Sequence, residues 1–151
     1  MYPEVSQKAK LILVIHENRG LNDWARRFAD EMAAKEFIAI ALDLLSRASE
    51  NMSKTSDFQN SDAARNAIYE LNPNQVTSDL DAAFDYAKSI PAGNGEVSVV
   101  GFCWGGTQSF RYATHNPDLE EVIVFYGTAP KDKVDLSKIQ VPVYAFYTLP
   151  S

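Results

Sequence analysis

The chain contains little cysteine and little histidine. Cys103 is the one cysteine among 151 residues, so the chain can form neither an internal disulfide nor a cysteine-rich metal site. The two histidines, His16 and His115, are separated by most of the chain, and together with one cysteine they make no set of metal ligands. These absences argue against a disulfide-stabilised protein and against a metalloenzyme.

Long apolar runs and clusters of positive charge are also missing. Apolar stretches such as residues 11–15 and 37–42 have only the length of a strand, whereas a membrane-spanning helix needs roughly 20 residues. The first four residues, Met-Tyr-Pro-Glu, lack the basic start and apolar segment of a secretory signal. The net charge is −6, and no block of Lys and Arg occurs. We therefore expect a cytoplasmic protein without membrane or nucleic-acid partners, although a chain that had lost its signal would look the same.

What the chain does contain is an alternation of buried strands and amphipathic helices. Hydrophobic residues make up 46% of it and charged residues 23%, which is typical of a globular domain. Asn22 is expected to cap a helix whose apolar stripe includes Trp24, Phe28 and Met32, with Ala25 and Ala29 as further candidates. Short apolar runs rich in Ile and Val predict strands, and apolar residues at helical spacing predict helices. The strands are predicted at 10–17, 37–42, 97–102, 122–126 and 141–146, and the helices at 23–35, 57–70, 73–89 and 105–115.

Strands that are apolar on both faces are typical of a parallel sheet covered by helices on both sides. The sequence therefore predicts an α/β fold with three layers, helix, mainly parallel sheet and helix. No repeat, low-complexity tract or linker interrupts the chain, so residues 1–151 are expected to form one domain.

Cys103 lies in the segment that carries the chemistry. Residues 101–106 read Gly-Phe-Cys-Trp-Gly-Gly, directly after a predicted buried strand and at the start of a predicted helix. This is the nucleophile-elbow pattern G-x-S-x-G with Cys in place of Ser. The glycines make room for a tight turn, and the start of a helix stabilises a thiolate. The N–H of Trp104 can serve as one donor of an oxyanion hole. The alternative is that Cys103 is a buried structural residue, but its context favours a nucleophile.

Several segments together resemble the dienelactone hydrolase family of α/β-hydrolases. They are Val-Ile-His-Glu-Asn-Arg-Gly-Leu-Asn at 14–22, Asp-Leu at 43–44, the segment 99–106 that holds the elbow, and Phe-Tyr-Gly at 125–127. The resemblance covers nearly the whole chain in the same order. It implies hydrolysis of enol-lactones and related small esters by a Cys–His–Asp triad and a thioester intermediate, without a metal or organic cofactor.

The resemblance also implies roles for individual residues. Cys103 matches the nucleophile, and Glu17 matches the carboxylate that helps to generate the thiolate. The backbone N–H of Asn18 completes the oxyanion hole with that of Trp104. Arg65 and Tyr69 match the pair that meets the substrate carboxylate and lines the pocket. Chemistry alone leaves alternatives open: Glu17 can be a solvated or capping residue, Arg65 a solvated helix residue and Trp104 a packing residue.

The chain departs from the family pattern where the rest of the triad belongs. The resemblance implies a Gly-x-x-Asp turn after the fifth strand and a later His, but Thr148 occupies the glycine position and no Asp follows. The strands that usually come before the first parallel strand are also missing, so the chain corresponds to a central, partial domain that lacks the usual C-terminal part. We expect exposed apolar sheet surface and, if the chain is truncated, a homo-oligomer.

Neither histidine is expected to replace the missing base. His115 lies twelve residues after Cys103 along one helix, about 18 Å at 1.5 Å per residue, and is expected to stabilise the C-terminus of that helix. His16 is expected to order the loop that follows it, and Asp43 to hold a turn. The competing functions are a noncatalytic binding protein with this fold and a redox-active thiol protein. The latter is disfavoured because the chain contains no resolving cysteine.

Overall fold

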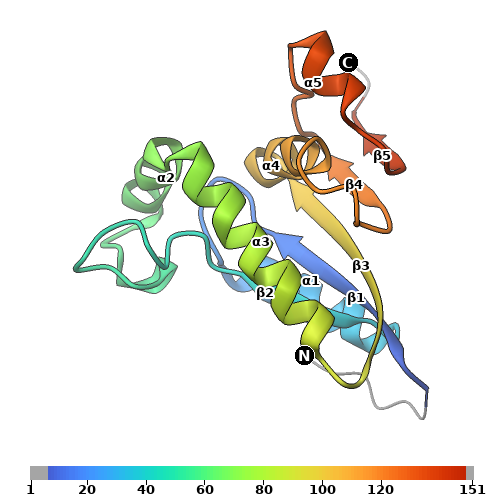
Figure 1. Ribbon diagram of the computed structural model, residues 1–151. Helices are drawn as coiled ribbons and strands as arrows, with labels where there is room; N and C mark the ends of the chain where they lie inside the picture. The colour runs from blue at the N-terminus through green and yellow to red at the C-terminus, as the bar shows by residue number, and fades with distance from the viewer. Residues whose placement is uncertain (1–6, 149–151) are drawn as a thin grey trace.

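The computed structural model describes residues 7–148, which form one five-stranded parallel sheet with helices on both faces (Figure 1). The strand order is β2-β1-β3-β4-β5, and every neighbouring pair is parallel. The strands are β1 (Ala9–Ile15), β2 (Ile38–Leu42), β3 (Gly93–Phe102), β4 (Val122–Phe125) and β5 (Val143–Phe146). The helices are α1 (Asp23–Ala34), the 3-10 turn η1 (Thr55–Asp57), α2 (Ser61–Glu70), α3 (Pro73–Ser89), α4 (Trp104–Ala113) and α5 (Lys133–Ser137). The predicted α/β fold is therefore confirmed.

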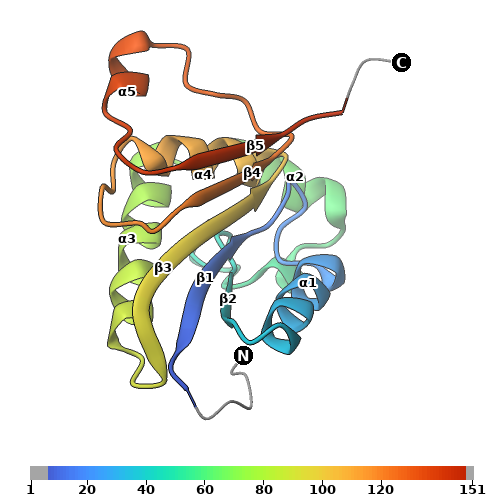
Figure 2. The same ribbon diagram turned by 90° about the vertical axis from the view of Figure 1, so that its right-hand side faces the viewer.

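The strand order changes direction at β1. The chain moves from β1 to β2 toward one edge, then returns past β1 to β3 and continues to β4 and β5. Because crossover connections share the same handedness, this reversal places α1 on one face of the sheet and α3 and α4 on the other, as Figure 2 shows. Ligand sites of open parallel sheets lie at such a switch point, outside the carboxyl ends of the strands. The fold thus directs attention to the ends of β1 and β3.

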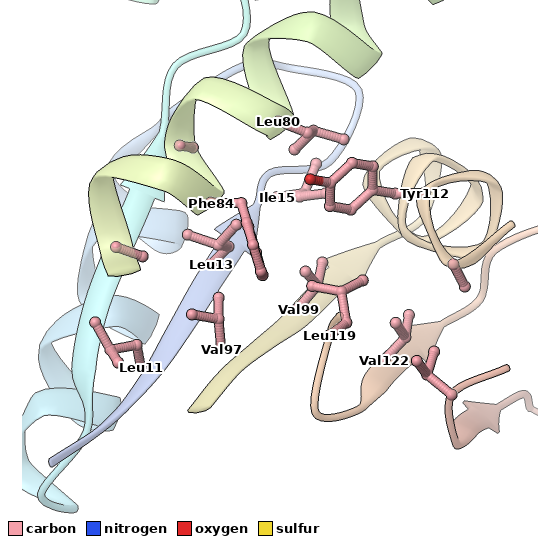
Figure 3. Close-up of a cluster of buried hydrophobic side chains, with 14 of the residues drawn as sticks. Leu11, Leu13, Ile15, Leu80, Phe84, Val97, Val99, Tyr112, Leu119 and Val122 are labelled. Atoms are coloured by element: carbon pink, nitrogen blue, oxygen red, sulfur yellow. The ribbon is translucent and has the colours of Figure 1, made fainter. Parts of the chain in front are cut away.

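The larger hydrophobic core lies between the sheet and the helices α3 and α4 (Figure 3). Leu11, Leu13 and Ile15 project from β1 toward this face and are fully buried. The hydroxyl of Tyr112 on α4 donates to Asp81 at 2.8 Å. Burial raises the pKa of Tyr112, so the phenol stays neutral while its ring fills the core.

Helix α1 contributes small side chains to the second core, which lies between this helix and the sheet. Ala25, Ala29 and Ala33 are the buried residues of this helix, whereas Trp24 is 46% exposed. The predicted stripe is therefore confirmed for Ala25 and Ala29, which let the helix lie close to the sheet, and was wrong only in placing the half-exposed Trp24 at its centre. Trp24 and Phe28 flank that contact and pack edge-on against Phe102 at centroid distances of 4.7 and 4.9 Å.

An aromatic row runs across the sheet on the α1 face. It consists of Phe102 on β3, Phe125 on β4 and Phe146 on β5, with successive ring centroids 5.0 Å apart. Beyond α1 the row is uncovered in the described part of the chain, since Phe146 and its neighbour Tyr144 are each 51% exposed. This agrees with the expected exposed apolar sheet surface. The described residues also contain no helix that is both long and apolar enough to cross a membrane.

Several predicted boundaries were wrong for local reasons. The helix predicted from residue 57 begins at Ser61, because the Asn60 side chain accepts from the N–H groups of Asp62 and Ala63. The strand predicted from residue 97 begins at Gly93, because Gly93 pairs with Ala9 of β1. Helix α5 was missed, because its five residues bury no side chain and leave no periodic signal. The bounds of α3 and the Asn22 cap of α1 were predicted correctly.

Candidate active site

Cys103 occupies the turn between β3 and α4, as the elbow pattern predicts. Its backbone angles are φ 53° and ψ −113°, a left-handed conformation that residues other than glycine rarely adopt. Its N–H donates to the carbonyl of Phe125 at 2.8 Å, which ties the turn to β4. The side chain is exposed to solvent. The structure therefore presents this thiol at the tip of a strained turn.

The glycines around Cys103 permit backbone-to-backbone contact. A Cβ on Gly101 would collide with the carbonyl of Gly105 and with the hydroxyl of Ser109. A Cβ on Gly105 would collide with the carbonyl of His16 and lie 2.5 Å from that of Ile15. The first turn of α4 thus rests directly on the ends of β3 and β1. A side chain at Gly101 would push α4 away from β3, and one at Gly105 would push it away from β1.

The strand register brings Glu17 and Cys103 to the same edge. Ile15 of β1 is paired with Gly101 of β3. Glu17 lies two residues after Ile15, and Cys103 lies two residues after Gly101. Glu17 is half-buried, and its carboxylate forms no hydrogen bond with any residue in the range 7–148. The Glu17 carboxylate is therefore available to accept a proton, at the edge where the thiol projects.

His16 is fully buried between the end of β1 and the elbow. Its Nδ1 lies 2.8 Å from the carbonyl oxygen of Glu17, and its Nε2 accepts the N–H of Leu44 at 3.2 Å. Its ring stacks on Trp104 with a centroid distance of 5.7 Å and an interplanar angle of 11°. Burial lowers the pKa of His16, so the imidazole is neutral. The expected ordering of the loop is confirmed, but the sequence carried no sign of the contact with Trp104.

Asp43 and Thr55 hold the far end of the loop that follows β1. The carboxylate of Asp43 accepts from the N–H and the hydroxyl of Thr55 at 2.7 and 2.8 Å. The hydroxyl oxygen of Thr55 also accepts the N–H of Leu21 at 2.9 Å. The turn role expected for Asp43 is therefore confirmed. Thr55 was missed, because a threonine in a polar segment carries no distinguishing signal.

The predicted substrate-binding pair lies against the loop after β1. The side-chain amide of Asn18 donates to the hydroxyl of Tyr69 at 3.1 Å, and the Arg65 guanidinium lies 5.9 Å from the centre of the Tyr69 ring. Arg19, which sequence reasoning did not select, contacts the hydroxyl of Ser61 at 2.6 Å at the start of α2. The structure thus brings Asn18, Arg65 and Tyr69 together.

His115 lies at the other end of α4. Its Nε2 is 3.0 Å from the Asp81 carboxylate on α3. His115 was expected to stabilise the C-terminus of its own helix, but its partner in the structure is this side chain of another helix. A groove of about 720 Å³ between α3, α4 and residues 128–138 includes His115 but none of the predicted site residues. We assign the candidate site to the strand ends around Cys103, because the strained turn and the register converge there.

Comparison with known proteins identifies the family. The family model described as the dienelactone hydrolase family matches residues 1–149. The chain belongs to the dienelactone hydrolase family. A Methylorubrum extorquens protein provisionally named a carboxymethylenebutenolidase is 30% identical over 146 residues, covering 90% of this chain and 49% of that protein. Carboxymethylenebutenolidase 1 of Cupriavidus pinatubonensis is 25% identical over 132 residues, covering 87% and 56%.

Solved structures of this family share the fold. A protein from Klebsiella pneumoniae provisionally assigned as a dienelactone hydrolase superposes with a TM-score of 0.79 at 24% identity, covering 95% of this chain and 63% of that one. A dienelactone hydrolase-like promiscuous phosphotriesterase from metagenomic libraries gives a TM-score of 0.74 at 25% identity, covering 93% and 57%. The present chain spans about half the length of the curated relatives that it matches.

Proposed function

We propose that this protein hydrolyses small esters or lactones through a thioester on Cys103. The observation that carries the proposal is the strained turn at φ 53°, which presents an exposed thiol at the start of α4. Such strain persists only where the surrounding structure enforces it, and it concentrates at functional sites. Membership of the dienelactone hydrolase family supports the same chemistry. The five strands of the described residues form a single sheet, which supports one domain.

In the acylation step, the Cys103 thiol gives its proton to the Glu17 carboxylate and its sulfur attacks the acyl carbon. The carbonyl π electrons move to oxygen, where the N–H groups of Asn18 and Trp104 stabilise the oxyanion. Collapse of this intermediate breaks the C–O bond, and the leaving alcohol or enol takes the proton from Glu17. Water then hydrolyses the thioester to a carboxylic acid and restores the thiol.

Arg65 is proposed to bind a carboxylate on the substrate. Its contact with Tyr69 is with a ring rather than with an acid, so its hydrogen-bond donors remain available to a planar anion. Tyr69 is 57% exposed and forms a wall beside Asn18. Replacing Arg65 by Met is expected to raise KM for an ester that carries a carboxylate while leaving KM for a neutral ester unchanged.

A noncatalytic binding role is the second candidate, and one observation favours it. Neither histidine of the described chain can activate water at Cys103. Both ring nitrogens of His16 already have backbone partners, and His115 follows the C-terminal end of α4, whereas Cys103 precedes its N-terminal end. A chain without such a base would not turn over, and its site would then serve only to bind a ligand.

Rapid mixing with p-nitrophenyl acetate tests the hydrolase reading and separates the two candidates. We expect a burst of about one p-nitrophenolate per chain, which is the signature of an accumulating acyl-enzyme. Cys103→Ala should abolish the burst, and Glu17→Gln should slow it. A burst of equal size and rate in Cys103→Ala would overturn the assignment of Cys103, and the absence of any burst would favour a binding role.

A further inference from the structure

The ring of His16 contacts both halves of the site around Cys103. One ring nitrogen faces the carbonyl of Glu17, and the ring face stacks on Trp104. Glu17 and Trp104 belong to different strand ends, one following β1 and the other following β3. The imidazole is fully buried. It therefore links two segments that must keep a fixed relation if they are to bind one oxyanion.

The hydrogen bonds of His16 define its tautomer. Nε2 accepts the N–H of Leu44, so this nitrogen carries no proton. Nδ1 must then carry the proton in the neutral ring, and it donates to the carbonyl of Glu17. The ring is thus held on two sides by backbone groups, and its orientation is fixed before any substrate binds.

The bond to Glu17 controls the direction of the next N–H. The carbonyl of Glu17 and the N–H of Asn18 belong to one peptide group, which is planar and trans, so the two point in opposite directions. Because the carbonyl is turned toward the buried ring, the Asn18 N–H is turned away from it. The other donor, the Trp104 N–H, is one bond from the Cα whose side chain stacks on the same ring. Packing of Gly105 on the His16 carbonyl keeps the two backbones in contact.

We propose that His16 is a positioning residue that orients both oxyanion donors, the Asn18 N–H through the Glu17 carbonyl and the Trp104 N–H through ring stacking. The inference rests on the proposed function, because it assumes that an oxyanion forms beside Cys103. His16 itself does not touch the reacting atoms. Loss of its bonds should therefore affect the steps that create an oxyanion and spare those that do not.

Two reactions of Cys103 differ in this respect. Acylation by p-nitrophenyl acetate passes through an oxyanion, whereas alkylation by iodoacetamide displaces iodide from carbon without one. Removing one oxyanion donor typically lowers a rate by about 100- to 1,000-fold, so a misdirected donor is expected to lower it by about 10- to 100-fold. We expect His16→Phe, which keeps a ring but loses both hydrogen bonds, to slow acylation by that factor and to change alkylation by less than about twofold.

Two further variants keep the inference testable if His16→Phe does not fold. The amide of His16→Asn can still donate to Glu17, because its nitrogen takes the place of Nδ1, whereas His16→Gln places its amide nearer to Leu44. Acylation should be faster in His16→Asn than in His16→Gln, at equal alkylation rates. His115→Phe is the matched control, since this histidine lies outside the site, and both of its rates should equal those of the wild type.

The outcomes are distinguishable. Equal loss of acylation and alkylation in the His16 variants, or equal acylation in His16→Asn and His16→Gln, would refute a positioning role. A burst that is missing from the wild type, or one that survives Cys103→Ala, would refute the proposed function instead.

Discussion

The strained turn at Cys103 makes an unusual prediction about stability. In most elements glycine is less stable than alanine by roughly 0.5–1 kcal/mol, because it loses more backbone freedom on folding. At Cys103 the angles of φ 53° and ψ −113° cost a residue with a Cβ about 1–3 kcal/mol, whereas glycine adopts them freely. The difference between the centres of these two ranges leaves a net gain of about 1 kcal/mol. Cys103→Gly should therefore have a larger free energy of unfolding than Cys103→Ala.

Urea unfolding followed by tryptophan fluorescence measures this difference directly. Both variants lack the thiol, so the loss of sulfur contacts cancels between them. Gln108 in α4 provides the matched control, since Gln108→Gly should be less stable than Gln108→Ala by about 1 kcal/mol. If Cys103→Gly is no more stable than Cys103→Ala, the turn is not strained in solution, and the structural argument for a nucleophile there fails.

Three further predictions concern the surroundings of the site. Gly105→Ala should lower the free energy of unfolding by about 1–3 kcal/mol and slow the burst, because its Cβ meets the carbonyls of Ile15 and His16; unchanged values would contradict the close contact. Below pH 6.5 the unfolded chain binds a proton at His16, whereas the folded chain, in which the pKa of His16 is lowered, does not. The free energy of unfolding should therefore fall with decreasing pH by up to about 1.4 kcal/mol per pH unit. His16→Gln should flatten that part of the pH profile, and a profile unchanged by this variant would count against a buried neutral imidazole. Phe146→Ser together with Tyr144→Ser should shift the chain from an oligomer to a monomer in light scattering, because Phe146 ends the aromatic row and both side chains are half exposed; a wild type that is already monomeric would refute this.

Much of the architecture followed from local patterns in the sequence. Continuous apolar runs such as residues 97–102 predicted central parallel strands, and Pro73 at the start of a periodic segment predicted both ends of α3. The glycines around Cys103 predicted a strand-to-helix turn, which the structure contains. These signals are strong because each depends on residues that are close together in the chain.

Contacts between distant segments left weaker signals. The stacking of His16 on Trp104 joins two strand ends, and the bond between Asn18 and Tyr69 joins residues 51 positions apart. Nothing in either local sequence specifies such a partner. In α1 the alanines were predicted only as secondary members of the apolar stripe, since hydrophobicity draws attention to Trp24 rather than to the small residues that fit the sheet.

The central claim is that Cys103 carries the acyl group. Acid quenching of the wild type after brief exposure to p-nitrophenyl acetate, followed by peptide mass spectrometry, locates the modification. We predict one acetyl group per chain on the peptide that contains Cys103, labile to hydroxylamine as a thioester is, and its absence when iodoacetamide has reacted first. Acetylation confined to lysines, or an unmodified Cys103 despite release of p-nitrophenolate, would contradict the account.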